Sequence, residues 1–422
     1  MNRAWMRDPL RAGMEARVRG TQRLALGAAL TLAFFALALK LCAAMEGAAV
    51  IALVGAGCAA LLLAGAWRAL REEPVIVLLC AALLAMLAVA AHLAMLDIKP
   101  GRMSKVLAPM LEGMWNYDLG TAMAWEDGAW SGGYLIVLAL TRGAKPGAAV
   151  GAMLACVLAP TMLLSAGCWA QCDAMFAALT LWGLALLLGV HPVWGCMLWG
   201  LAAATKLQAA FLFPLLLVFF MKGKVSIRHL LAGLAAFVLM QAAFLMDGQG
   251  LAAVFGRYAQ QINEMAYEGA GLADHAAGVY SLMTVASVRE FSGMGMYLGF
   301  ACALLVAFAL IHAHADVDAD TLLLAGLLLA AGLPLILPQM NARSLYLAGM
   351  LAFACAGSAR RLAIAGVLEL ISLCSYMEAI FNCTIIPMNV LSLMAIACAT
   401  VILLELLDKL GIKGALSRES NA

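Results

Sequence analysis

Charged residues are scarce in this chain of 422 residues, and their scarcity excludes an ordinary soluble globular protein. Only 12% of the residues are charged, 65% are hydrophobic, and the mean hydropathy is +0.98. Soluble domains typically carry about 25% charged residues. The polar–apolar alternation of membrane β-barrels is also absent. Long apolar runs recur instead, and about 20 apolar residues suffice for a helix to cross the hydrocarbon core. The sequence therefore predicts an all-α integral membrane protein.

The chain also lacks the patterns of a disulfide framework, a metal site or a nucleic-acid-binding surface. Most of its twelve cysteines lie within apolar runs, where they act as small hydrophobic residues. Cys168 and Cys172 are four residues apart, but no His or Cys pair completes a metal-binding set. The net charge of +2 gives no indication of a nucleic-acid partner. We expect no metal, no cofactor and no nucleic acid.

No cleavable signal peptide is evident, and we expect residues 1–22 to be a basic cytoplasmic anchor. Basic residues mark cytoplasmic segments, and the later basic turns agree with a regular alternation of sides. The alternation predicts one polytopic domain over residues 1–422, with about 12–14 transmembrane helices. Both termini are expected in the cytoplasm, including the tail 408–422. The basic residues used are Arg3, Arg7, Arg11, Arg17, Arg19, Arg23, Arg68, Arg71, Arg142, Lys145, Lys222, Lys224, Arg228, Arg360 and Arg361.

The same alternation gives two long extracytoplasmic segments, residues 98–130 and 247–293. The apolar block 193–221 is too long for one crossing and too short for two, and Thr205–Gln208 interrupts it. We expect two short helices there, meeting at an outer vertex that carries Lys206. The other spans are predicted near 23–45, 47–66, 74–97, 131–141, 146–165, 172–190, 229–246, 294–314, 320–338, 344–358, 362–380 and 386–407.

Unusual polar residues collect on the outer side of this topology. Ionisable groups at membrane depth are functional candidates, although each has a plainer interpretation. Asp173 could cap its own helix, Lys206 and Arg343 could extend to headgroups, and Gln208 and Asn341 could join helices by hydrogen bonds. Their convergence on one face favours a binding site. The set comprises Asp97, Trp169, Gln171, Asp173, Lys206, Gln208, Asn341 and Arg343.

Three motifs carry a family resemblance over residues 98–350. Trp169-Ala170-Gln171-Cys172-Asp173 precedes Lys206-Leu207-Gln208 with Pro214, and Leu337-Pro338-Gln339-Met340-Asn341-Ala342-Arg343 follows, with Tyr346 beyond. This pattern resembles bacterial polytopic GT-C glycosyltransferases, in particular those related to the second mannosyltransferase of glycosylphosphatidylinositol assembly. Those proteins read W-G-Q-x-D, then F-K-x-Q ahead of a proline, then L-P-x-M-H-E-R-Y.

The resemblance implies a GT-C-like bundle that moves a mannose-like hexose from a polyprenyl-phosphate donor to an extracytoplasmic glycan or lipid-linked acceptor, with inversion. Lys206 and Arg343 would offset the phosphate charge, while Trp169 and Gln171 would orient the sugar. A carboxylate would accept the acceptor's proton. Membrane lipid, donor and acceptor are the expected partners.

The chain departs from this pattern at the expected base. The group has an aspartate in a G-D-Y element, which aligns with Gly101-Arg102-Met103, and arginine cannot act as a base. Arg102 is therefore assigned to substrate binding. Two alternatives stay open: a catalytically degenerate relative that binds lipid-linked glycans or serves as a partner subunit, and a transporter or flippase, which should show paired broken helices. The substitute base candidates are Asp97, Asp118, Glu126 and Asp127.

Overall fold

The computed structural model describes residues 159–165, 173–246, 272–283, 288–313, 317–355 and 358–411, together with the isolated positions 250, 252 and 256. This part of the chain is 80% helical, which confirms the helical prediction. Four of its helices are long and apolar enough to cross a membrane. They cover Phe291–Ile311, Ala319–Ile336, Arg360–Phe381 and Met388–Lys409.

Several predicted features lie outside the described residues, so the total of 12–14 helices and the cytoplasmic placement of the termini stay predictions. The same holds for the extracytoplasmic segment 98–130 and for most of 247–293. The spans concerned are 23–45, 47–66, 74–97, 131–141 and most of 146–165.

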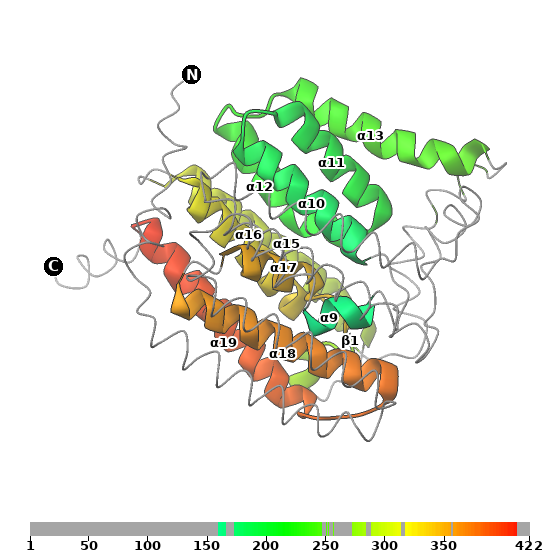
Figure 1. The fold of residues 1–422 in the computed structure, drawn as a ribbon, viewed down its shortest axis with the longest axis vertical. Helices are drawn as coiled ribbons and strands as arrows, with labels where there is room; N and C mark the ends of the chain where they lie inside the picture. Colours follow the sequence, from blue (N-terminus) through cyan, green and yellow to red (C-terminus); the bar gives the residue numbers. More distant parts are fainter. Residues whose placement is uncertain are drawn as a thin grey trace, which may run out of the picture.

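The first group of helices consists of α10 (Asp173–Leu188), α11 (Pro192–Thr205), α12 (Phe213–Met221) and α13 (Ile227–Met246). A tight turn leads from α10 into α11, and Pro192 occupies the first turn of α11, where its missing N–H costs nothing. Helix α11 packs between α10 and α13 (Figure 1). The indole Nε1 of Trp199, which is fully buried, donates to the Thr180 carbonyl at 2.6 Å and so joins α11 to α10.

The second group surrounds α16 (Ala319–Ile336), which is buried along almost its whole length. Helix α16 packs against α15 (Val288–Ile311), α17 (Tyr346–Cys355) and α19 (Met388–Lys409), while α18 (Ala359–Phe381) lies against α17 and α19. The two groups meet where α12 contacts α15 and α10 contacts α17. Helices α13, α15 and α19 expose many large apolar side chains, as expected of helices that face lipid.

The predicted interruption of 193–221 is confirmed. Helix α11 ends at Thr205, Lys206 is extended (φ −153°, ψ 131°), and a 3-10 helix, η5 (Leu207–Leu212), leads into α12. Pro214 in the first turn of α12 explains part of this break. A proline there has no N–H for the carbonyl four residues earlier and its ring would clash with that carbonyl, which disfavours a regular α-helix through this point.

Two predicted segments differ in detail from the described helices. Helix α15 begins at Val288 rather than near 294, so six residues assigned to the extracytoplasmic segment 247–293 are helical. In the described part of the predicted span 344–358, the structure has the ten-residue helix α17, which is about 15 Å long and covers about half of the hydrocarbon core. Hydropathy does not distinguish such a buried connecting helix from a short span, because both are apolar on every side.

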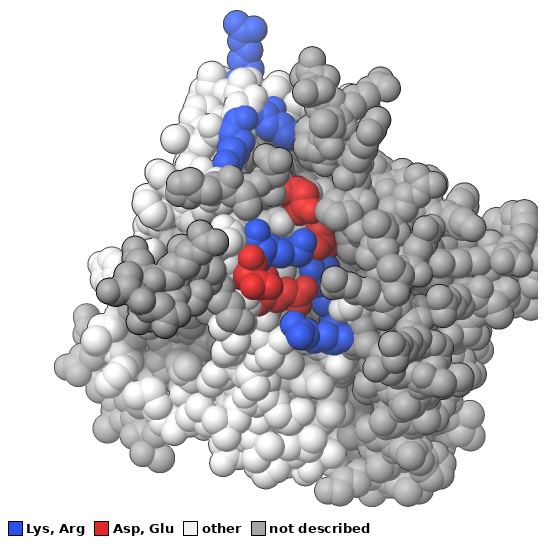
Figure 2. Space-filling view, turned by 90° about the vertical axis from the view of Figure 1, so that its left-hand side faces the viewer, with Lys and Arg blue, Asp and Glu red and all other residues white. Residues whose placement is uncertain are grey.

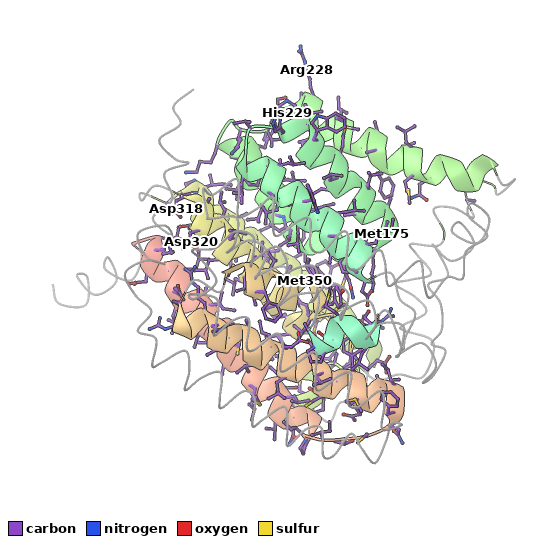
Figure 3. All side chains as sticks on the ribbon, in the orientation of Figure 1. Met175, Arg228, His229, Asp318, Asp320 and Met350 are labelled. Carbon is purple, nitrogen blue, oxygen red and sulfur yellow. The ribbon has the colours of Figure 1, made fainter. Side chains whose placement is uncertain are left out.

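Charged side chains of the described residues gather near the ends of the helices. At the start of α16, Arg361 donates to both Asp320 oxygens (2.6 and 2.9 Å) and to Glu405, while Lys409 pairs with Asp320 at 2.8 Å. Figure 2 shows acidic and basic side chains gathered in the middle of one face. In Figure 3, Asp318 and Asp320 lie at one end of the bundle, and Met175, in the first turn of α10, lies toward the other.

Helices α11 and α13 approach so closely that only glycine fits at their crossing. A Cβ on Gly200 would overlap the Gly233 carbonyl, and a Cβ on Gly233 would lie 2.7 Å from the Cys196 carbonyl oxygen. We expect Gly233→Ala to lower the free energy of unfolding by about 1–3 kcal/mol, because the backbones must separate. Thermal unfolding in detergent measures the change. Gly293→Ala is the matched control, since a Cβ there meets nothing within 4 Å; equal losses in both variants would contradict the crossing.

Candidate functional site

Asp173 is the centre of the candidate site. It is the first residue of α10, and its side chain is 1% exposed. The carboxylate accepts a hydrogen bond from Ser165 Oγ at 3.2 Å and forms an ion pair with Lys206 Nζ. Arg343 Nη1 lies 3.9 Å from the same oxygen, Oδ1, that pairs with Lys206. Asp173 therefore does more than begin its own helix: it is the shared counter-ion of two cations.

Lys206 reaches Asp173 because the chain is extended at the break between α11 and η5. Its ammonium also lies 5.2 Å from the centroid of the Phe176 ring, one turn after Asp173 on α10. The Lys206 side chain is 20% exposed, unlike that of Asp173. The cation is thus held by a buried carboxylate and an aromatic face while part of it remains accessible from outside.

Arg343 is positioned by a short strand pair and a local turn. Strand β2 (Met340–Asn341) pairs in parallel with β1 (Ala273–Asp274), and Gln339 N–H donates to the Leu272 carbonyl at 2.7 Å. Asn341 Oδ1 then accepts the Arg343 N–H at 3.1 Å, as in an Asx turn. Asn341 was predicted to bind substrate; in the structure its side-chain oxygen holds the backbone of Arg343.

Gln208 lies two residues after Lys206, in η5. Its Oε1 atom is buried and has no hydrogen-bond partner in the described part of the chain. Such an orphan acceptor calls for an explanation, because buried polar atoms are nearly always satisfied. A donor group of a bound molecule, such as a sugar hydroxyl, would satisfy it.

Three charged groups of the site are described. One buried carboxylate faces two cations, and both cations also interact with further groups. Lys206 and Arg343 are 20% and 18% exposed, so a molecule that approaches these three groups would meet the cations before the carboxylate.

Sequence reasoning missed two residues that interact with the Asp173 carboxylate. Ser165 donates to it directly, and Tyr376 of α18, which is fully buried, is close enough to interact electrostatically with Asp173 and Arg343. About two turns earlier on α18, Glu369 accepts a hydrogen bond from the Thr161 N–H. An acidic residue in the middle of the predicted span 362–380 was a signal that could have identified Glu369.

The structure brings together Asp173, Lys206 and Arg343, with Asn341 and Gln208 adjoining them in the chain. A common cavity stays a prediction. In the described part of the chain, no group of His, Cys, Asp and Glu side chains could hold a metal ion. The remaining predicted site residues lie outside the described residues: Asp97, Arg102, Asp118, Glu126, Asp127, Trp169 and Gln171.

No protein-family model, curated protein or solved structure matches the chain.

The ion pair predicts asymmetric effects of substitution. Lys206→Met would leave Asp173 buried with Arg343 as its more distant partner, and we expect it to lower the free energy of unfolding by about 3 kcal/mol. Adding Asp173→Asn should restore part of that loss, because the uncompensated charge is removed. Thermal unfolding in detergent of both single variants and the double variant measures the coupling. Lys222→Met, at the exposed end of α12, is the control; additive losses would contradict the pairing.

Proposed function

We propose that this chain is a GT-C-type glycosyltransferase of a bacterial inner membrane. It would transfer a mannose-like hexose from a polyprenyl-phosphate donor to an extracytoplasmic glycan or lipid-linked acceptor. The observation that supports this most is the convergence of Lys206 and Arg343 on buried Asp173 at the break between α11 and η5. The same residues belong to the motifs that resemble such enzymes.

The charge of the cluster suits a lipid-borne phosphodiester. A polyprenyl-phosphate sugar carries one negative charge, and Lys206 and Arg343 are the partly exposed members of the described cluster. Lys206 can donate up to three hydrogen bonds and Arg343 up to five, so each can contact more than one acceptor. As the sugar–phosphate bond breaks, charge builds up on the leaving phosphate, and fixed cations stabilise that charge best when they are already in place.

Asp173 is a poor choice for the catalytic base. Its side chain is 1% exposed and is engaged by Ser165, Lys206 and Arg343. A carboxylate held by two cations has little tendency to take a proton. We therefore assign Asp173 to holding the cations and look for the base among Asp97, Asp118, Glu126 and Asp127.

A second candidate function rests on Arg102. If none of those four carboxylates replaces the missing aspartate, the chain would bind a lipid-linked glycan, or act as a partner subunit, without catalysing transfer. A transporter or flippase ranks third, because 193–221 is the only broken block that the sequence shows.

Donor binding tests the phosphate contact. We expect Lys206→Ala to weaken binding of a polyprenyl-phosphate sugar roughly ten- to a hundredfold, since one charge-assisted contact is lost. Lys206→Arg should retain part of the affinity, because it keeps the charge but changes the geometry. Binding to purified protein in detergent gives the values, with Lys222→Ala as the control. Unchanged affinity in Lys206→Ala would remove the main reason for placing the phosphate here.

Turnover separates the enzyme from the binding subunit. Purified protein with a radiolabelled donor and an acceptor should release polyprenyl phosphate and label the acceptor. One of Asp97→Asn, Asp118→Asn, Glu126→Gln and Asp127→Asn should then abolish turnover while preserving donor binding, because the amide cannot accept the proton. Four active amide variants would place the base elsewhere. Donor binding without turnover by the wild type would favour the degenerate alternative, and Arg102→Asp would then be the variant to test for restored activity.

A further inference from the structure

The end of the first helix group that lies away from the candidate site carries charge of only one sign. Between Asp173 and Asp247 the sequence contains no acidic residue. Two cations of this stretch, Lys222 and Arg228, flank the turn that joins α12 to α13, and both are exposed. Figure 3 shows Arg228 pointing away from the bundle at this end. An anion that approaches the turn therefore meets no repelling carboxylate from residues 174–246.

The turn between α12 and α13 is held by its own hydrogen bonds. Gly223 adopts the left-handed conformation (φ +72°), which glycine takes without strain. Its N–H donates to the Phe220 carbonyl, and the next N–H along the chain donates to the Phe219 carbonyl, both at 2.9 Å, as in a Schellman motif. The Lys224 ammonium donates to the Leu188 carbonyl at 2.9 Å and so joins the turn to the last residue of α10. The backbone of the turn is therefore in place before any ligand binds.

The side chains of the two cations are available to a ligand. In the described part of the chain, neither Lys222 nor Arg228 has an ion-pair or hydrogen-bond partner for its side chain. Lys206, Arg361 and Lys409, in contrast, are each paired with a carboxylate. A ligand with a negative charge would thus not have to displace an existing partner at this turn.

Large apolar side chains lie beside these cations. Trp194, in the first turn of α11, is 60% exposed, and an exposed tryptophan near basic residues is typical of the boundary between lipid tails and headgroups. Helix α13 lies at the edge of the described fold (Figure 1). Four of its apolar side chains follow one another at helical spacing and are 47–59% exposed: Ile227, Leu231, Leu234 and Val238. This apolar stripe begins at the turn that carries the cations.

We propose that this end of the first helix group binds an anionic phospholipid. Lys222 and Arg228 contact its phosphate, and the apolar stripe of α13 contacts its acyl chains. A soluble acidic partner would account for the cations but not for the stripe, and an uncharged lipid would account for the stripe but not for the cations. Helix α11 has 14 residues, so its two ends are about 21 Å apart. The lipid site is therefore separate from Lys206, and the inference does not depend on the proposed function.

Lipid binding to the purified full chain in a neutral detergent tests the charge preference. Pyrene-labelled phosphatidylglycerol carries one negative charge, and pyrene-labelled phosphatidylcholine with the same acyl chains carries none. Energy transfer from the tryptophans of the protein reports binding. We expect Lys222→Gln and Arg228→Gln each to weaken phosphatidylglycerol binding about fivefold, and both together about 25-fold, because each basic residue near a headgroup contributes about equally. Binding of phosphatidylcholine should not change.

Arg360→Gln is the matched control. It removes an exposed cation at the start of α18, next to Arg361, which is paired with Asp320. A loss in Arg360→Gln as large as that in Arg228→Gln, or equal losses for the two lipids, would overturn the proposal. Free glycerol phosphate has the charged headgroup without acyl chains, so it should not displace phosphatidylglycerol at equal concentration. Displacement would show that the turn takes a soluble anion and would rule out the lipid.

A phosphatidylglycerol with a photoreactive diazirine in its acyl chain locates the bound lipid. Adducts mapped by mass spectrometry should concentrate on residues 227–238 and should fall about tenfold when Lys222→Gln and Arg228→Gln are combined. Helices α15 and α19 also expose large apolar side chains, so adducts on them serve as the internal reference and should not change. Equal adducts on all three helices, or no fall in the double variant at unchanged thermal stability, would mean that lipid only coats the apolar surface and would contradict a specific site.

Discussion

The pairing of one buried carboxylate with two cations is the constraint on which the described structure depends most. Asp173 has almost no contact with solvent, and a lone charge there would be very unfavourable. Its partners must therefore stay within reach, which fixes the break after α11 and the turn that carries Arg343. The ion pair joins three segments that are distant in sequence: α10, the α11–η5 junction and the loop after α16. Their relative placement is a condition for a stable chain, whatever ligand the site takes.

Close helix packing accompanies this ion pair, and it depends on small residues at the point where two helices cross. Gly200 and Gly233 let α11 and α13 meet at backbone distance. Lipid supplies no hydrophobic force that would press helices together, so close van der Waals contact and buried hydrogen bonds take on that role. The Trp199–Thr180 hydrogen bond and the Arg361 network serve the same purpose between other helices.

The sequence predicted well where several apolar helices begin and end, but it predicted poorly which way their side chains point. The predicted span 172–190 corresponds to α10, 362–380 to α18, and the vertex at Lys206 is observed, because hydropathy and polar interruptions report where a chain enters and leaves an apolar layer. They do not report which way a side chain points around its helix. The sequence predicted that Asp173 and Lys206 both belong to the site, but it did not predict that they pair with each other. Glu369 was overlooked because a single acid does not change the hydropathy of its helix, and its partner lies 208 positions away.

The strand pair β1–β2 has a topological consequence. Because it bridges Ala273 to Met340, it closes the chain between them, which contains α15 and α16, into a single loop. Ser392 of α19 accepts the Gly278 N–H at 3.1 Å just inside the same closure. The closing point lies two residues before Arg343. One of the two cations at the site is therefore held by the closure of a loop that contains two helices, in addition to its ion pair with Asp173.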